Sequence, residues 1–333
     1  MKYITNWRCI GATGLALVAF MPAASADEIV KVAVVQRGAW DSAAPELGQQ
    51  AGIFKKHGIV LELLYPQGSS DTEQRVLSGS VDVGVGVGIM ATMRTYSRGA
   101  PLRIIGANRT GAANYWYVLK SSPILTLKDI AGKTIAYATN GSSSHYDAID
   151  FTKQFGLKAR LVSTGEAAAT FQQLMSSNVD VGWAAPPFGV DEIEQGKIRV
   201  VAHANDVPAL RGKTVNVMIT NADTLQKRKD VLDRFVRAYR ETVEWMYSDP
   251  ASVKRYAELA GVSEGVAQRL RAEFFTRDML SPDTIVGLKS IMKDAVTLRY
   301  LQTKLSRKQL GELIQIPPVV ADRTGSIAPL VSP

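Results

Sequence analysis

The chain has 333 residues, 46% of them hydrophobic, and a formal net charge of +8, so it can bury a sizeable core. Its 39 basic residues are scattered along the sequence, which argues against nucleic-acid binding. The single cysteine and three histidines stand in none of the spacings typical of metal sites or activated nucleophiles, so we expect no disulfide, no metal, no cofactor and no enzymatic activity.

The first 26 residues have the features of a cleavable export signal. Lys2 and Arg8 precede an apolar stretch at 10–21, and Ala-Ser-Ala follows at 24–26. The stretch is shorter than the roughly 20 residues that a membrane span needs. Cys9 lies before the stretch, where it cannot carry a lipid anchor. We therefore expect a periplasmic protein without a lipid anchor.

Short apolar runs then alternate with helix-like segments. Strands are predicted at residues 30–35, 59–64, 81–87 and 102–105. The first helix is predicted at 43–57, the second runs from the turn at 66–70 to residue 78, and the third runs from the end of the strand 81–87 to residue 98. Strands that alternate with helices predict a parallel sheet with right-handed crossovers. The fold class expected is therefore α/β.

A second set of elements repeats the first. Strands are predicted at 134–137, 159–162 and 179–183, and helices at 142–155 and 167–176. Val-Asp-Val-Gly occurs at 81–84 and again 98 positions later at 179–182, which indicates two lobes of one design. Asp82 and Asp180 are expected to belong to this framework. The apolar segments 114–119 and 214–219 are predicted to be linker strands between the lobes.

From residue 224 onward the apolar spacing is helical, and one face gathers seven residues. They are Val231, Leu232, Phe235, Val236, Tyr239, Val243 and Met246. The predicted division is 27–112 for the first part of lobe 1, 113–215 for lobe 2, 216–316 for the completion of lobe 1 with C-terminal helices, and 317–333 for an irregular tail.

The loops at the strand ends of both lobes are the expected binding site, because open parallel sheets bind ligands there. The strongest segment, 139–145, stands before a helix whose free N–H groups can hold an anion. Ordinary N-capping by one serine is the alternative. The candidate ligand contacts are Trp40, Ser69, Ser70, Gly88, Arg109, Asn114, Asn140, Ser142, Ser143, His145, Glu166, Trp183 and Pro187.

Arg109 is the candidate that suggests an anionic ligand. It lies in a stretch, 83–128, that contains no acidic residue, and an arginine grips carboxylate or sulfonate with two hydrogen bonds. Trp40 and Trp183 suggest an organic body that can be aromatic, although such side chains are more often core. Glu166 would favour a ligand amine, although it also suits a helix start without a ligand.

One motif suggests a nucleotide instead. Gly86-x-Gly88-x-x-Ala91 follows a predicted strand, as a dinucleotide fingerprint does. An NAD site needs an acid about 20 residues on, which is missing, although an NADP site could use Arg109. Small residues that let backbones pack closely are the alternative explanation.

Three segments resemble the solute-binding proteins of bacterial ABC importers in the nitrate/sulfonate/taurine family, which are related to a pyrimidine-precursor-binding fold. They read AGIFKKHGI (51–59), RVLSGSVDVG (75–84) and LKDIAGKTI (127–135). The resemblance implies two lobes of the type II periplasmic binding fold that close on a small solute by hinge bending.

The resemblance also implies a function and partners. The protein would be a monomer that captures an anionic or zwitterionic solute, first a sulfonate or carboxylate, and delivers it to a membrane permease with its ATPase. The alternative is an enzyme or a binding protein for a pyrimidine or other heterocyclic precursor. A sensory or interaction domain would need a fused effector, and none is visible in the sequence.

Overall fold

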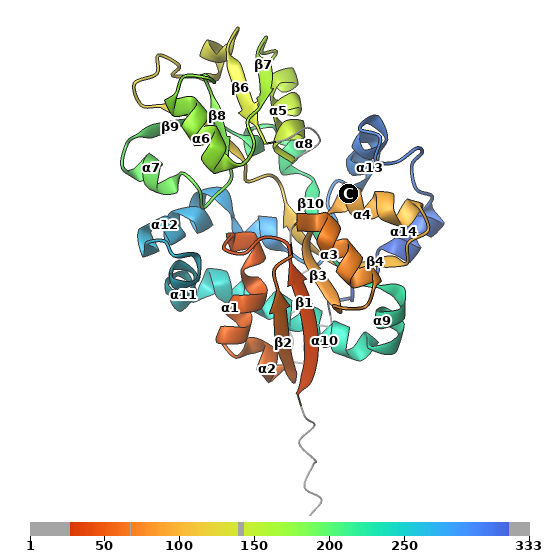
Figure 1. The fold of residues 1–333 in the computed structure, drawn as a ribbon. Helices are drawn as coiled ribbons and strands as arrows, with labels where there is room; N and C mark the ends of the chain where they lie inside the picture. The colour runs from red at the N-terminus through yellow and green to blue at the C-terminus, as the bar shows by residue number, and fades with distance from the viewer. Residues whose placement is uncertain (1–26, 67, 139–142, 320–333) are drawn as a thin grey trace, which may run out of the picture.

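The computed structural model describes residues 27–66, 68–138 and 143–319, which form two sheets with helices around them (Figure 1). The first sheet has the strand order β2-β1-β3-β10-β4. Its strands are β1 (Glu28–Val34), β2 (Ile59–Leu64), β3 (Val83–Gly88), β4 (Leu102–Thr110) and β10 (Thr214–Asn221). β1 is parallel to β2 and β3. The valines of β1 and β3 are buried, as expected for strands covered on both faces.

The helices next to the first sheet follow the predicted order with one exception. They are α1 (Ala44–Gln50), α2 (Ile53–Lys56), α3 (Gly68–Leu77), α4 (Ile89–Ser97), α9 (Ala222–Lys227) and α10 (Lys229–Ser248). The single helix predicted at 43–57 is wrong, because Gly52 at φ +75° separates α1 from α2. The seven apolar residues predicted for the face of α10 are all buried. Within the described residues, none of the helices is long and apolar enough to cross a membrane.

The second sheet repeats the strand order of the first. Its elements are β5 (Tyr115–Leu119), β6 (Thr134–Tyr137), β7 (Arg160–Ser163), β8 (Gly182–Ala184) and β9 (Ile198–His203), with helices α5 (Ser143–Gln154), α6 (Ala167–Met175) and α7 (Val190–Glu194). Strands β8-β5-β9 form one ladder and β6-β7 another. The Val181 N–H donates to the Thr134 carbonyl, and the Val181 carbonyl accepts the Ala136 N–H. These two hydrogen bonds join the two ladders. The joined order β7-β6-β8-β5-β9 therefore matches β2-β1-β3-β10-β4.

The segments predicted as linker strands lie inside the sheets, so that prediction was wrong. β5 lies between β8 and β9, and β10 lies between β3 and β4, each antiparallel to both neighbours. Each follows a segment that crosses from the other sheet and so enters its own sheet from the opposite end. The crossings are residues 111–114 and, on the return, η3 (Ala204–Asp206) with α8 (Pro208–Arg211). Both sheets are consequently mixed and parallel-rich.

The repeated aspartates hold equivalent places. Asp82 accepts a hydrogen bond from the Lys31 N–H in β1, and Asp180 accepts one from the Thr134 N–H in β6, both at 2.8 Å. Asp82 thus ties the start of β3 to β1, and Asp180 ties the start of β8 to the equivalent strand β6. This confirms the interpretation of the repeat as a framework feature.

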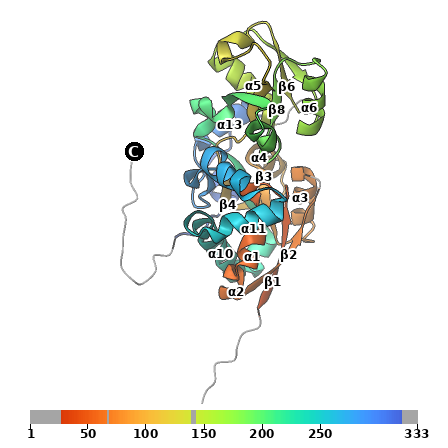
Figure 2. The same cartoon turned by 90° about the vertical axis from the view of Figure 1, so that its left-hand side faces the viewer.

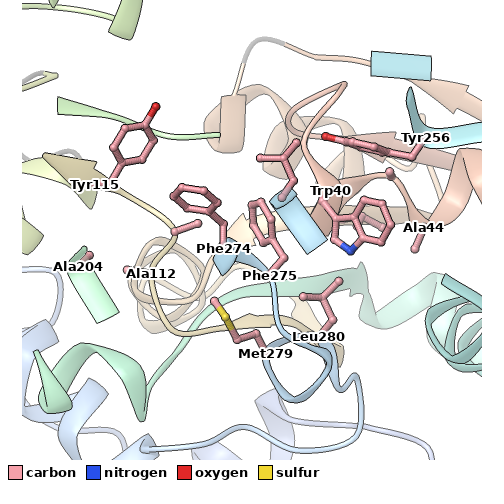
Figure 3. Packing of buried hydrophobic residues seen from close by; sticks show 14 of the residues in the cluster. Trp40, Ala44, Ala112, Tyr115, Ala204, Tyr256, Phe274, Phe275, Met279 and Leu280 are labelled. Atoms are coloured by element: carbon pink, nitrogen blue, oxygen red, sulfur yellow. The ribbon is translucent and has the colours of Figure 1, made fainter. Parts of the chain in front are cut away.

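The C-terminal helices complete the core between the two sheets. They are α11 (Ala251–Ala260), α12 (Glu264–Arg269), the π-helical turn η4 (Leu270–Phe274), η5 (Arg277–Leu280), α13 (Leu288–Thr297) and α14 (Arg307–Leu313). Figure 3 shows Phe274 and Phe275 between Tyr115 of the second sheet and Trp40 of the first. The rings of Tyr115 and Phe274 are 5.3 Å apart. Figure 2 shows α5, α6, β6 and β8 gathered at one end of the molecule, beyond the first sheet.

Candidate ligand-binding site

A buried ion pair marks the C-terminal end of β4. Arg109 Nη1 lies 3.1 Å from Oδ2 of Asp41, which belongs to the short helix η1 (Trp40–Ser42), and the Asp41 side chain is only 6% exposed. The preceding residue, Asn108, donates from Nδ2 to the Asp41 carbonyl at 2.8 Å and to the Tyr239 hydroxyl at 2.9 Å. Asp41 is therefore held by the strand at both its backbone and its carboxylate.

Two buried polar atoms at this strand end have no partner among the described residues: Asn108 Oδ1 and Arg109 Nε. Gly86, at φ +86° within β3, lies next to the first of them. A Cβ on Gly86 would stand 3.6 Å from Ser42 Oγ and 3.7 Å from Asn108 Oδ1. The absent side chain therefore leaves these oxygens beside one small space. A buried polar atom without a partner costs about 1–3 kcal/mol, so such a pair needs an explanation in a bound molecule or ordered water.

A second polar pair connects the crossing segment to the second sheet. Asn114 Nδ2 donates to Asp147 Oδ2 of α5 at 2.6 Å, and both residues are buried. Burial raises the pKa of Asp147 to about 7, against the lowering effects of the Asn114 hydrogen bond and the Arg109 charge. Asn114 and Arg109, both predicted contacts, are thus connected electrostatically through Asp147.

Aromatic rings line the start of α5. His145 stacks on Tyr137 with ring centroids 4.2 Å apart, and its other neighbour is Tyr146. Burial lowers the pKa of His145, so the site favours its neutral imidazole. Tyr146 meets Tyr300 edge-on at 6.1 Å, and the guanidinium of Arg94 on α4 lies over the Tyr300 ring. This row of rings reaches from the second sheet to helices that flank the first.

The other predicted contacts near the first sheet differ in their burial and in their hydrogen-bond partners. Trp40 is fully buried, donates from Nε1 to the Tyr247 hydroxyl at 3.0 Å and meets the Tyr256 ring edge-on, which favours the core alternative. Ser69 Oγ, at the start of α3, accepts the Gly88 N–H at 3.4 Å, so these two residues are adjacent. Ser70 is exposed.

The predicted contacts of the second sheet are also dispersed. Trp183 is 7% exposed and donates to the Gly165 carbonyl at 3.2 Å. Glu166 is exposed at the N-cap of α6, where its side chain makes no capping hydrogen bond. Pro187 follows a cis peptide bond and is partly buried. Ser143 begins α5, whereas Asn140 and Ser142 lie outside the described residues.

Five residues of this site are absent from the sequence-based set of contacts: Asp41, Ser42, Gly86, Asn108 and Asp147. A signal existed for three of them, since Gly86 begins the glycine motif that follows the third predicted strand. Asn108 stands beside Arg109 at the end of an otherwise apolar strand, and Asp41 lies in the loop of small and polar residues that contains Trp40. Asp147 gave no such signal, because a polar residue in a helix is usually solvated.

The arrangement can recognise a polar group without adding net charge. Asp41 already balances the charge of Arg109, while the unpartnered Arg109 Nε–H offers a donor and Asn108 Oδ1 an acceptor. Such a set suits a ligand that both donates and accepts hydrogen bonds. Within the described residues, no three His, Cys, Asp or Glu side chains are grouped so that they could hold a metal ion.

Comparisons with known structures support the fold. The aliphatic sulphonate-binding protein SsuA of Escherichia coli is 17% identical with a TM-score of 0.70 over 91% of this chain and 97% of its own. The alkanesulfonate-binding protein SsuA of Xanthomonas axonopodis pv. citri, bound to MOPS, is 17% identical with a TM-score of 0.65 over 88% of this chain and 100% of its own. The expected type II periplasmic binding fold, and the resemblance to these proteins at that level, are confirmed.

Sequence comparisons identify the family. The 4-amino-5-hydroxymethyl-2-methylpyrimidine phosphate synthase of Uromyces fabae is 23% identical over 258 residues, 72% of this chain and 73% of its own. The model of the family described as NMT1/THI5 like matches residues 43–253. Because this match covers more than half of the chain, the protein belongs to the NMT1/THI5-like family.

Proposed function

We propose that the protein is the solute-binding component of an ABC importer, which captures a small organic solute between its two lobes in the periplasm and delivers it to a membrane permease. The observation that carries this proposal is the pair of buried, unpartnered atoms at the end of β4, Asn108 Oδ1 and Arg109 Nε. A solute that bonds both would satisfy them. The likeness of fold to sulfonate-binding proteins supports the same function.

The ion pair bears on the class of ligand. A simple sulfonate or carboxylate would bring a negative charge to Arg109, whose charge Asp41 already balances at 3.1 Å. A zwitterion, or a heterocycle with a ring N–H and an adjacent acceptor, would bond the same atoms without that excess charge. We therefore favour a zwitterionic or heterocyclic solute over the simple organic anion first expected from the sequence.

Thermal-shift measurements with sulfonates, taurine, aromatic acids, nitrate and pyrimidines test this proposal. A ligand at 100 times its Kd stabilises the folded protein by about 2.7 kcal/mol. Arg109→Gln should abolish the stabilisation, whereas Arg75→Gln, which removes an arginine paired with Asp71 on α3, should retain it. Stabilisation by nitrate alone, or equal stabilisation of the Arg109→Gln variant, would contradict the proposal.

The location is tested separately. If residues 1–26 are a cleaved signal, the protein from a periplasmic extract should begin at Asp27. An intact leader on the cell-associated protein would argue against periplasmic solute capture, whatever ligand the protein binds.

Enzymatic action on a pyrimidine precursor is the second candidate, because the Uromyces relative that spans 72% of the chain is named a pyrimidine phosphate synthase. His145 and Glu166 are the titratable predicted contacts of the second lobe. Release of a ligand chemically unchanged after prolonged incubation would favour transport. Turnover that His145→Ala or Glu166→Ala abolishes without loss of binding would favour an enzyme.

A further inference from the structure

A hollow lies apart from the candidate site, between β9 and the π-helical turn η4. It consists of two adjoining cavities of about 290 and 370 Å³, which share His203, Glu273 and Phe274. None of its lining residues belongs to the candidate site. β9 is part of the second sheet, whereas η4 continues α12, which packs on α11 and through it on α1 beside the first sheet. Both halves of the molecule therefore contribute walls.

The lining of the first of these cavities combines apolar and cationic side chains. The apolar residues are Ile193, Ile198, Val200 and Phe274, and the cationic residues are Lys120, Arg199 and Arg269. Glu273 is the one carboxylate of the lining, and it accepts a hydrogen bond from Arg269 Nε at 3.0 Å. Three cations against one carboxylate leave an excess of positive charge around the cavity.

Arg199 is fixed in place without a described acidic partner. Its Nη2 donates to the carbonyls of Ser122 and Ile124 at 3.0 and 2.7 Å, and its buried Nε has no partner among the described residues. Backbone carbonyls orient the guanidinium but do not neutralise it. An anion in the cavity would supply the missing opposite charge.

His203 lines both cavities. Its backbone N–H donates to Asp206 Oδ2 at 2.8 Å at the start of η3, and its imidazole carries a ring N–H donor in either neutral tautomer. The imidazole packs beside the rings of Tyr115 and Phe274, with centroid distances of 6.4 and 5.3 Å. The histidine is therefore held by contacts on both sides of the junction.

We propose that this hollow is a second ligand site, specific for a small organic carboxylate. The carboxylate would lie among Lys120, Arg199 and His203, and an apolar body would cover Ile193 and Val200, which are partly exposed. An inorganic anion would leave these apolar side chains exposed to water, so an organic anion fits the cavity better. The site is independent of the ligand proposed for Arg109.

Fluorine NMR titration of the purified protein with 4-fluorobenzoate tests this site. We expect saturable binding that the Lys120→Gln/Arg269→Gln double variant weakens at least tenfold, because two of the attracting charges are removed. Glu273→Gln should tighten binding severalfold, because it removes the repelling charge. Lys120 and Glu273 are exposed and Arg269 is partly exposed, so these changes should leave the fold intact, which the thermal unfolding midpoint checks.

Arg109→Gln is the control that separates the two sites. Unchanged 4-fluorobenzoate binding in this variant supports a second site, even if the function proposed for the first site fails. Loss of binding in Arg109→Gln would place the probe in the first site and overturn the proposal. Unaltered binding by the double variant, or no binding at millimolar probe, would also overturn it.

Discussion

Asp147 gives the sharpest test of the electrostatics at the junction. Its carboxylate is buried in α5 and accepts one hydrogen bond, from Asn114. Burial is the main reason that its pKa rises to about 7 from an ordinary 3.8. Since the folded protein favours the protonated carboxyl, ionisation costs stability. This cost is absent below about pH 4, grows as the pH rises to about 7, and stays constant above that.

The Asp147→Asn variant removes this cost and keeps the oxygen that accepts the Asn114 N–H. A pKa near 7 in place of 3.8 corresponds to about 4 kcal/mol at 1.36 kcal/mol per pH unit. This is an upper bound, because water entry on ionisation would reduce it. From pH 4 to pH 8, we expect the unfolding free energy of the variant to rise by at least about 2 kcal/mol relative to that of wild type.

Urea unfolding of both proteins at pH 4, 6 and 8 measures the difference in the free energy of unfolding. Glu62→Gln, at an exposed position on β2, is the control and should show the same pH dependence as wild type. If Asp147→Asn differs from wild type by the same amount at pH 4 and pH 8, the carboxyl does not titrate near neutrality. The description of Asp147 as an unfavourably buried charge would then be wrong.

Two further predictions concern the framework and the first site. Asp82→Ala and Asp180→Ala should each cost about 1–3 kcal/mol in urea unfolding, because each leaves a strand N–H without its acceptor, while ligand affinity stays unchanged. Gly86→Ala should cost about 1–2 kcal/mol for the positive φ and weaken ligand binding, because its methyl group would fill the space beside Asn108. Gly79→Ala carries the same backbone cost in open space, so unchanged affinity in that variant and a loss in Gly86→Ala would separate the two effects.

Apolar spacing and the short sequence repeat predicted the buried helix face and the framework of the two sheets. The apolar spacing of α10 matches its buried face, and the two Val-Asp-Val-Gly segments hold equivalent places in the two sheets. Strand direction was not predictable in this way. An apolar run such as that of β5 or β10 reads the same in either direction, and only the crossing of the chain between the sheets makes both strands antiparallel.

The site was harder to predict, because its contacts join distant parts of the chain. Trp40 stands among small and polar neighbours, which suggests exposure, but Tyr247 of α10 and Tyr256 of α11 cover it. Arg109 lies in a stretch without acids, which suggests a free cation, but Asp41 reaches it from the first strand's loop. The residues adjacent in sequence therefore predicted the surroundings of neither Trp40 nor Arg109.

The duplicated sheet explains why the ion pair bears on function. In each sheet the parallel strands end toward the junction, so the loops after β1 and β3 meet the end of β4 where the chain crosses over. Asp41, from the loop after β1, meets Arg109, from the end of β4, where the crossing segment starts, and Gly86 within β3 lies beside the adjacent Ser42 and Asn108. A ligand bound there would contact the residues adjacent to the crossing, and under the proposed function the crossing is the part of the chain that would bend as the lobes close. Recognition and closure would then depend on the same few residues, with Asp41 setting the charge that the ligand meets.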